Sequence, residues 1–442
     1  MKFVAGKIIS GCSNTDQTTR AAHARFGKRA FQIVRRAKHW GVLDLETALT
    51  RVLAALPPPR TESLALTDAT GLVLTEAVCS PSDLPLFDNS AMDGYAVRAA
   101  DVRTARPDAP VHLRVKTRIA AGDFFSGELT TGDCARLFTG SPMPRGADAV
   151  VMQEDTRTDA ARPDEVLICD SVREGESVRR QGEDVRKGAR LLEAGAALTA
   201  GATGLLAAAG VVRVNVGRQP TVGLLATGSE LREPGATLLP GQIYESNRAM
   251  LTPLVAQAGG IPKVFPIVTD TLAATRSALE RALAECDVVV TSGGVSVGEM
   301  DFVKAAFEAI GGELQFWKVA IRPGRPFVFG RLGEKFLFGL PGNPVSAFVT
   351  FLLLVRPALR RWQGAQNVGL PSHPGFLGEA ISNPGDRRHF VRVRVDGDGK
   401  VFSAGGQMSH MLVSLAEADG LLDVPPRTVL AVGTTVRVLR TR

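Results

Sequence analysis

The sequence predicts an α/β fold combined with β-rich domains. We expect a doubly wound parallel sheet in a central domain, a small β domain inserted in an N-terminal α/β region, and a β-barrel-like C-terminal domain. A chain of 442 residues is too long for one core, so several domains are expected. In residues 219–362, apolar strands alternate with helical spacing, which is typical of a parallel sheet covered by helices. Residues 95–180 and 363–442 instead show short strands separated by turn residues.

Composition indicates a globular protein whose positive charge is confined to one terminal segment. Apolar residues make up 45% of the chain, charged residues 22%, and the net charge is +7. Residues 1–41 hold nine Lys and Arg against one acidic residue, so the rest is close to neutral. Because aromatic residues are also scarce, the sequence of the folded part does not indicate a surface that binds nucleic acid. No uninterrupted apolar stretch reaches about 18 residues, so no membrane span is expected.

The positions of the cysteines and histidines indicate which redox and metal chemistry to expect. The cysteines lie far apart without CxxC spacing, which predicts free thiols in a reducing compartment and a cytoplasmic location. The histidines are scattered and form no zinc-binding pattern.

Residues 1–41 are expected to form a basic extension outside the folded domains. The Arg-rich, nearly acid-free composition fits a disordered arm, an upstream extension of uncertain start, or an organellar transit peptide. We expect a disordered arm without a role in the chemistry. A secretory signal is not expected, because no apolar stretch precedes a small-residue cleavage site.

Residues 42–218 form the N-terminal region. Helical spacing of apolar residues predicts a helix over 42–56, ended by three prolines. The inserted β subdomain is expected at about 80–188. Its loop 83–95 mixes Pro, Asn and Asp with apolar residues, a weak functional hint. The charged stretch 179–184 closes the insertion, and a solvated turn is the alternative interpretation of it.

Residues 219–362 predict the central α/β domain. Asn247 is expected to cap a helix over 249–258, and further helices are expected over 275–285, from 302 onward, and up to Arg361. Strands are predicted over 221–226, 263–268, 287–291, 313–319, 327–329 and 335–339. Ligands of such sheets bind outside the carboxyl ends of the strands.

Gly-rich loops follow three of these strand ends and suit an anion. Backbone N–H groups in such loops, together with helix N-termini, can cradle phosphate. The residues expected to bind phosphate and substrate are Gly228, Ser292, Gly293, Gly294, Gly298, Pro341, Gly342 and Asn343.

Four carboxylates, Glu230, Asp270, Glu299 and Asp301, are expected at the same edge. Each alone could be a helix cap. Together with the Gly-rich loops they predict a Mg²⁺–phosphate site, because Mg²⁺ takes hard oxygens and shares them with substrate phosphates.

Cationic residues add the opposite charge beside this edge. Arg322 and Arg325 flank a Pro-Gly turn after Lys318 and offer donors to a tetrahedral oxyanion or phosphate. Ordinary pairing with the neighbouring acids is the alternative. In the C-terminal β domain, 363–442, the clusters 387–392 and 406–410 taken alone would be surface decoration.

The residues together resemble the MoeA family of molybdopterin molybdenumtransferases, whose vertebrate relative is the E domain of gephyrin. The resemblance covers the chain from about Val42 onward. It rests on the strings at 87–95, 139–151, 180–184, 227–230, 292–301, 322–326 and 340–346.

The resemblance implies a MogA-like central domain within an elongated homodimer of four-domain chains. It implies that adenylylated molybdopterin and molybdate give molybdenum cofactor and AMP, with Mg²⁺ as cofactor. The active site would lie between subunits, so that Asp93 and Asp184 face the partner's α/β site as catalytic residues. A MogA-like adenylyltransferase is the expected partner protein; nucleic acid and membrane are not.

Roles for single residues follow from the same resemblance. Glu230, Asp270 and Asp301 would serve the metal and the hydrolysis, and the Gly-rich loops would hold phosphate and pterin. Ser229, Arg322 and Arg325 depart from the commoner family residues, Asp and Lys, which changes the geometry at the molybdate site. Molybdate would be held by Ser296, Lys318, Arg322, Arg325, Ser346, Arg388 or Arg392, and Ser409.

Two other functions remain open at this point. One is the preceding adenylyl transfer of MogA-like proteins, against which the large N-terminal region and the C-terminal β domain argue. The other is a scaffold without chemistry, which the presence of all four carboxylates disfavours.

Overall fold

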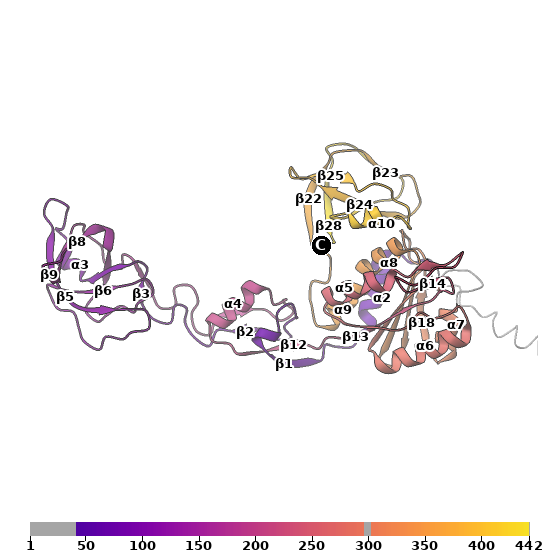
Figure 1. Cartoon of the computed structure of the whole chain (residues 1–442), viewed down its shortest axis with the longest axis horizontal. Coiled ribbons are helices and arrows are strands. Elements are labelled where there is room, and N and C mark those ends of the chain that lie inside the picture. Colours follow the sequence, from indigo (N-terminus) through magenta and orange to yellow (C-terminus); the bar gives the residue numbers. More distant parts are fainter. Residues whose placement is uncertain (1–40, 296–301, 442) are drawn as a thin grey trace, which may run out of the picture.

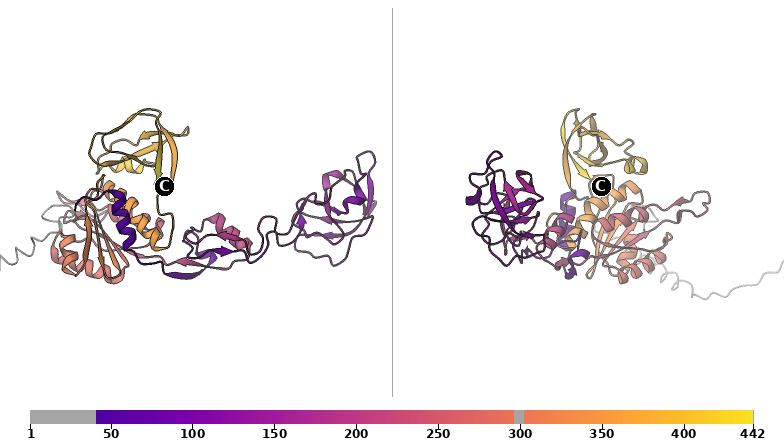
Figure 2. Two further views of the ribbon diagram at one scale, coloured as in Figure 1. Left: turned by 180° about the vertical axis from the view of Figure 1, so that it is seen from behind. Right: turned by 60° about the vertical axis from the view of Figure 1, so that its left-hand side comes forward.

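The chain folds into four parts that form an elongated molecule. The computed structural model describes residues 41–295 and 302–441. A β domain at one end is joined through a narrow middle part to an α/β domain, beside which the C-terminal barrel lies (Figures 1 and 2).

The domain at the far end is built from a mixed six-stranded sheet, in the order β7-β4-β6-β5-β9-β8. Its core comprises two clusters of buried side chains, one around Val97 and Val151 and the other around Leu137. We call this part the distal β domain. Its elements are β3 (Asn89–Ser90), β4 (Gly94–Val97), α3 (Ala99–Val102), β5 (Val111–Ile119), β6 (Asp133–Leu137), β7 (Ala149–Met152), β8 (Thr156–Asp159), β9 (Arg162–Ile168) and β10 (Val178–Arg179).

The middle part is crossed twice by the chain. On the way out, β1 (Thr61–Ala65) and β2 (Val78–Cys79) leave the α/β domain; on the way back, β11 (Arg190–Leu192) and β12 (Arg213–Gly217) return to it. β1 pairs antiparallel with β12, and β2 with β11. The helix α4 (Ala200–Ala208) covers a small apolar cluster on these strands.

The α/β domain has a six-stranded sheet in the order β16-β13-β17-β21-β20-β18. The first four strands are parallel, as predicted, but β20 is antiparallel to both neighbours. The expectation of an all-parallel sheet is therefore wrong at this end, because the short turn at Gly333 returns the chain directly beside β20. The strands are β13 (Thr221–Ala226), β16 (Ile261–Val264), β17 (Val288–Ser292), β18 (Glu313–Trp317), β20 (Val328–Leu332) and β21 (Lys335–Leu340).

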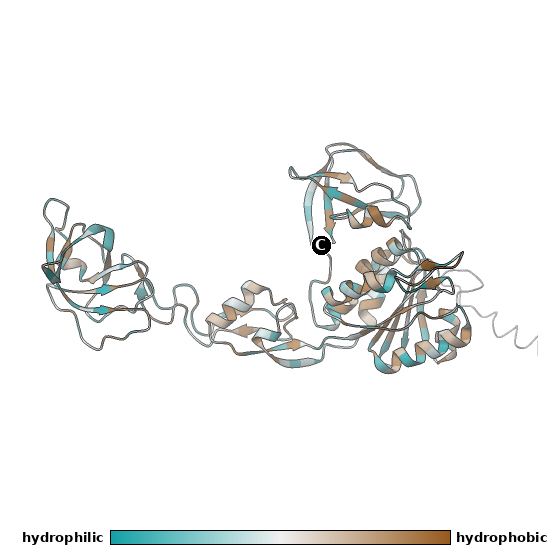
Figure 3. Ribbon diagram, in the orientation of Figure 1, coloured by the Kyte–Doolittle hydropathy of each residue, from teal (hydrophilic) through white to brown (hydrophobic). Residues whose placement is uncertain are grey.

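Helices cover both faces of this sheet, which confirms the doubly wound arrangement. On one face α5 (Asn247–Gln257), α8 (Pro344–Thr350), the π-helical η3 (Phe351–Val355), α9 (Arg356–Trp362) and α2 (Leu45–Ala55) share one apolar cluster with the strands. On the other face lie α6 (Leu272–Glu285) and α7 (Val303–Ala309). Apolar residues, brown in Figure 3, gather in the strands and on the inner sides of the helices.

The C-terminal domain is a closed five-stranded barrel, since β24 pairs with β26 as well as with β25. Its strands are β22 (Ser372–Leu377), β24 (Arg388–Val395), β25 (Lys400–Ser403), β26 (Gly420–Val424) and β28 (Thr435–Arg440), with β23 (Ile381–Asn383), β27 (Thr428–Leu430) and α10 (Leu412–Ala416). One strand of the α/β domain, β19 (Ile321–Arg322), pairs in parallel with β24. The barrel agrees with the prediction.

Within residues 41–295 and 302–441, the helices are all too short or too polar to cross a bilayer. The four cysteines in this part of the chain are free thiols.

Candidate functional site

A cavity of about 670 Å³ opens at the carboxyl ends of β13, β17 and β21. This is the edge at which the sequence places the ligand. The phosphate-binding candidates among the described residues all line it, namely Gly228, Ser292, Gly293, Gly294, Pro341, Gly342 and Asn343. These Gly-rich loops therefore form the part of the cavity wall that the sequence places at the carboxyl ends of the strands.

The loop after β17 packs directly on the loop after β13. Gly293 has φ +87° and Gly294 φ +67°, in the left-handed region that side chains rarely adopt. A Cβ at Gly293 would lie 2.5 Å from the Thr227 carbonyl oxygen, a backbone atom that cannot give way. Only glycine allows this approach, so the two strand ends form one floor of the cavity.

Gly293→Ala should destabilise the α/β domain by about 3 kcal/mol or more, because backbone strain and a backbone clash add together. Gly235→Ala is the matched control: Gly235 has φ +90° but nothing within 4 Å of its added Cβ, so about 1 kcal/mol is expected. Urea unfolding followed by tryptophan fluorescence measures both. Equal losses in the two variants would show that the contact with Thr227 has no cost.

Two of the predicted carboxylates, Glu230 and Asp270, line the cavity. Asp270 is fixed by a reciprocal pair of bonds with Ser229: the Ser229 N–H donates to Asp270 Oδ2 at 2.9 Å, and the Asp270 N–H donates to Ser229 Oγ at 3.0 Å. The strand before Asp270 ends earlier than predicted, at Val264, but the parallel bridge between Thr227 and Val268 brings the chain back to the edge.

Buried polar atoms on the cavity wall favour a polar ligand. Thr227 Oγ1, Ser292 Oγ and Asn247 Oδ1 are buried and have no hydrogen-bond partner in the described part of the chain. All three residues line the cavity. A buried polar atom without a partner costs free energy, so a hydrogen-bonding ligand would stabilise this wall.

The role of Asn247 differs from the prediction. α5 begins at Asn247 itself, and its first N–H groups are satisfied by the buried Glu245, whose Oε1 accepts from the Asn247 and Arg248 N–H groups at 2.6 and 3.0 Å. Asn247 Nδ2 instead donates to the Gly342 carbonyl oxygen at 2.7 Å. Asn247 is therefore not the helix cap that the sequence predicts; its side chain instead connects α5 to the third Gly-rich loop.

The cationic residues that were predicted to hold molybdate do not line this cavity. Lys318 holds its ammonium 3.7 Å from the centre of the Trp317 ring. Arg322 is paired in β-register with His389, and Arg325 is exposed next to Pro326, which does line the cavity.

Two serines predicted to hold molybdate flank the first turn of α8. Ser346 is buried within that helix. Ser409 belongs to the C-terminal domain and reaches across to it, because its Oγ accepts from Asn343 Nδ2 at 3.0 Å and its carbonyl from the Val345 N–H at 3.2 Å. The two domains thus meet beside Asn343, at the mouth of the cavity.

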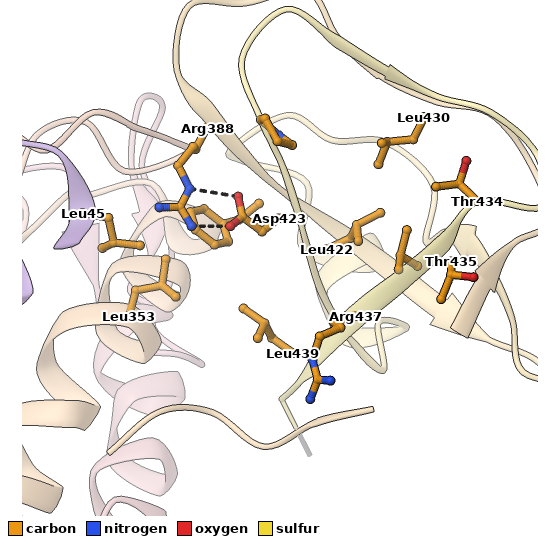
Figure 4. A pocket seen from close by; sticks show the side chains of 13 residues that line it. Leu45, Leu353, Arg388, Leu422, Asp423, Leu430, Thr434, Thr435, Arg437 and Leu439 are labelled. Atoms are coloured by element: carbon orange, nitrogen blue, oxygen red, sulfur yellow. Dashed lines mark hydrogen bonds and ion pairs between the residues drawn. The ribbon is translucent and has the colours of Figure 1, made fainter. Parts of the chain in front are cut away.

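Arg388 occupies a different pocket, between α2 and the barrel (Figure 4). Its guanidinium binds both oxygens of Asp423 within the barrel and Glu46 on α2. These acidic neighbours raise the pKa of Arg388. It joins two domains and is already paired with carboxylates, so the structure does not bring it to the mouth of the cavity.

Arg392 is fully buried. Its Nε donates to Ser414 Oγ at 3.0 Å, and NH2 donates to the Gly406 and Met408 carbonyl oxygens at 2.6 and 3.2 Å. Burial lowers the pKa of Arg392. Of the two alternatives, Arg392 is thus the one that supports the loop carrying Ser409.

Asp93 and Asp184 belong to the other end of the molecule. Asp93 precedes β4 and accepts from Thr139 N and Oγ1 at 2.8 and 2.9 Å, bonds that lower its pKa. Asp184 is exposed beside Leu84. The middle part separates both from the cavity of the same chain (Figure 1).

Four predicted residues, Ser296, Gly298, Glu299 and Asp301, lie outside the described residues. In the part that is described, no three acidic, histidine or cysteine side chains are grouped as for a metal ion.

Sequence reasoning missed further residues of the cavity wall. Tyr244, His410 and Leu412 line it from the β14–β15 strand pair (Leu231–Arg232, Ile243–Tyr244) and from the barrel. No local pattern marks Tyr244 or Leu412, and the cluster 406–410, which contains His410, was interpreted as surface decoration when taken alone.

Glycine-rich loops, carboxylates and unpaired polar atoms at the strand ends of a doubly wound sheet are the features expected of a protein that binds a phosphorylated ligand. Comparison with known proteins identifies the protein family to which the chain belongs. Family models match in chain order: the MoeA N-terminal region (domain I and II) over 43–210, a probable molybdopterin binding domain over 223–361, and the MoeA C-terminal region (domain IV) over 375–440.

Relatives and solved structures agree with these matches. The molybdopterin molybdenumtransferase 2 of Mycobacterium tuberculosis is 41% identical over 84% of this chain and 93% of its own. That of Haemophilus influenzae is 37% identical over 86% and 93%. A molybdopterin biosynthesis MoeA protein from Pyrococcus horikoshii has a TM-score of 0.75 at 32% identity, covering 90% of this chain and 99% of its own. The chain belongs to the MoeA family.

Proposed function

We propose that this chain is a molybdopterin molybdenumtransferase, an enzyme of molybdenum cofactor biosynthesis that inserts molybdenum into molybdopterin. The observation that carries the proposal is the cavity with its three Gly-rich loops, in a chain that matches family models of MoeA over 43–210 and 375–440 and of a probable molybdopterin binding domain over 223–361. The substrates are adenylylated molybdopterin and molybdate, and AMP is released.

The cavity residues would hold the phosphoanhydride of the adenylylated substrate. The Gly293 N–H already donates to the Leu340 carbonyl oxygen at 3.1 Å, whereas the backbone N–H groups of Gly294 and Gly342 would donate to phosphate oxygens. Thr227 Oγ1 and Ser292 Oγ supply buried hydroxyls without partners in the described chain. These donors would orient the bond to AMP and stabilise the charge that forms when it breaks.

Glu230 and Asp270 fit a magnesium ion. Mg²⁺ usually binds one or two carboxylates and completes its shell with water and substrate phosphates, which two carboxylates beside a phosphate cradle would allow. Bound there, Mg²⁺ would neutralise charge on the phosphate oxygens. The Ser229 N–H holds the Asp270 carboxylate in place for this role. Asp301 is proposed as the third acidic residue.

The molybdate end would lie beside Asn343, where the barrel meets α8. Ser409, Ser346, Lys318, Arg322 and Arg325 are the proposed contacts, with Arg392 supporting the Ser409 loop. Positive charge and hydroxyl donors are the chemistry that a tetrahedral dianion requires.

We further propose a homodimer in which the distal β domain of one chain completes the cavity of the other. Asp93 and Asp184 cannot serve the cavity of their own chain. Around Asp93, the large apolar side chains of Leu86, Phe87 and Met92 are 55%, 45% and 42% exposed, as a contact surface would require. A cytoplasmic location and delivery of the substrate by a MogA-like adenylyltransferase complete the proposal.

The direct test is to incubate purified protein with adenylylated molybdopterin, molybdate and Mg²⁺. We expect AMP release and active molybdenum cofactor. If the protein instead releases pyrophosphate from ATP and molybdopterin, the adenylyltransferase alternative holds; if it does neither, it is a scaffold.

Mixing two inactive variants tests the shared site. Asp93→Asn and Asp270→Asn should each lose activity, but in a heterodimer one of the two sites receives wild-type residues from both chains. Random exchange should therefore restore about a quarter of wild-type activity. Wild-type protein mixed with Asp270→Asn keeps half of the wild-type activity with or without exchange and so gives only the activity scale; exchange itself is proven by isolating the heterodimer of two differently tagged chains. No recovery after proven exchange would place Asp93 outside the partner's site.

A further inference from the structure

The cavity at the strand ends buries polar groups and exposes apolar side chains, the reverse of the usual distribution. Two of its hydroxyl groups, Thr227 Oγ1 and Ser292 Oγ, are buried. Three of its large apolar side chains are exposed, Ile243 by 54%, Tyr244 by 48% and Leu412 by 42%. Single exposed apolar residues are normal on a protein surface, but three in one cavity indicate a place for a ligand. The ligand that suits this cavity is polar at one end and apolar at the other.

Tyr244 holds its aromatic ring in a fixed place on the cavity wall. Its backbone belongs to β15, where it pairs with Arg232 of β14. Its hydroxyl donates to the Ala236 carbonyl oxygen at 3.0 Å. The residue is therefore held through both its backbone and the tip of its side chain, and its hydroxyl hydrogen is already used. What Tyr244 offers to a ligand is the flat face of the ring and not an acid or a base.

The ring lies next to one of the carboxylates proposed to bind magnesium. The Ile243 N–H donates to the Glu230 carbonyl oxygen at 3.0 Å, and the Glu245 N–H donates to the Arg232 carbonyl oxygen at 2.8 Å. These two bonds flank Tyr244 and place it beside the segment that begins at Glu230, and both residues line the cavity. A group attached to phosphates bound at Glu230 would therefore lie near the Tyr244 ring.

A planar nitrogen heterocycle is the chemical group that suits this part of the wall. Flat heterocyclic rings stack on the face of an aromatic side chain, and this contact requires no particular hydrogen bond. Leu412, the first residue of α10 in the barrel, lines the same cavity from another domain and would add apolar contact. The substrate of the proposed reaction carries two such rings, adenine and pterin, which are linked through its phosphates.

We propose that Tyr244 stacks against a heterocyclic ring of the phosphorylated substrate, and that Ile243 and Leu412 enclose this ring. The proposal rests on the proposed function and adds to it the residues that recognise a ring of the substrate. It assigns Tyr244 to binding and not to a chemical step, because the hydroxyl is bonded within its own loop. Adenine and pterin share the required chemistry, and the experiment distinguishes them.

Calorimetric titration of the full-length protein tests the inference with three probes: AMP, ribose 5-phosphate and, in the absence of oxygen, molybdopterin. Tyr244→Leu should weaken the binding of AMP, of molybdopterin or of both at least fivefold, the lower end of the range for stacking contacts. Ribose 5-phosphate lacks the base, so its affinity should stay within twofold of wild type. A loss for AMP assigns adenine to Tyr244, and a loss for molybdopterin assigns the pterin.

Two further variants separate the ring from its surroundings. Tyr244→Phe keeps the aromatic face but loses the bond to Ala236, so its affinities should stay within about twofold of wild type. Leu239→Ala is the matched control, because Leu239 is 63% exposed on the loop between β14 and β15 but does not line the cavity. Its affinities should equal those of wild type, and thermal melting checks that each variant folds.

The inference is overturned if Tyr244→Leu loses less than fivefold for both AMP and molybdopterin, or if wild type binds neither. It is also overturned if ribose 5-phosphate loses as much as AMP, or if Leu239→Ala equals Tyr244→Leu. Binding needs no turnover, which separates the inference from the proposed function. Wild-type protein that shows the expected losses on substitution but releases no AMP from adenylylated molybdopterin keeps the inference and rejects the proposed function. AMP release together with unchanged affinities in Tyr244→Leu rejects the inference alone.

Discussion

Asp270→Asn is expected to lower the rate of AMP release by at least about a hundredfold, the size of effect seen when one group that stabilises transition-state charge is removed. The asparagine keeps the shape of the side chain and can still accept from the Ser229 N–H, which now donates at 2.9 Å. What disappears is the negative charge at the cavity wall. The measurement is single-turnover AMP release at saturating Mg²⁺, which excludes product release as the limiting step.

The controls separate charge at the cavity from charge elsewhere in the domain. Glu230→Gln should show a comparable loss, because Glu230 lines the same cavity. Glu280→Gln removes a half-exposed carboxylate that pairs with Arg276 on α6, and it should retain wild-type activity. If Asp270→Asn lost less than threefold, Asp270 would have no part in metal binding or in the chemistry.

The second large effect concerns stability at mildly acidic pH. His389 is buried, and neither ring nitrogen has a hydrogen-bond partner in the described chain. Burial, and then the charges of Arg322, Arg392 and Arg387, lower its pKa from 6.5 to about 4. Between about pH 6.5 and 4, His389 therefore takes up a proton in the unfolded chain but stays neutral in the folded chain. Stability is complete above pH 6.5 and falls by about 3 kcal/mol by pH 4.

His389→Phe should remove this part of the pH dependence, because its ring is of similar size and cannot take up a proton. Urea unfolding at pH 7.5, 6, 5 and 4 measures the slope, and His112→Gln, which replaces an exposed histidine, is the matched control. An unchanged slope in His389→Phe would mean that His389 is protonated in the folded protein, with a rearranged Arg322.

The sequence predicted the parts of the site that depend on short stretches of chain. A β-branched strand followed by Ser292-Gly293-Gly294 is a local pattern, and so is the strand before Gly228; both loops lie where parallel-sheet topology requires. Two of the predicted carboxylates, Glu230 and Asp270, lie at the same cavity for that reason.

What could not be predicted depends on contacts between distant segments. Arg388 was one of two arginines expected to help hold molybdate, but Glu46, 342 residues earlier, and Asp423 on a neighbouring strand bind its guanidinium. Nothing near Trp317 in the sequence indicates that the ammonium of Lys304, on α7, lies 3.5 Å from its ring centre. The strand β20 was predicted, but its antiparallel direction was missed because a buried strand has the same apolar pattern in either direction.

The pairing of β19 with β24 has a consequence for how the chain folds. Ile321 and Arg322 lie opposite Arg388 and His389, and Arg387 NH1 donates to the Ile321 carbonyl oxygen at 3.2 Å. Phe390 on the same strand joins the apolar cluster of the α/β domain. During synthesis, β19 emerges well before its partner strand. β19 can therefore pair with β24 only after the barrel strands have been synthesised. A chain truncated after Trp362 would expose apolar surface and would be prone to aggregate.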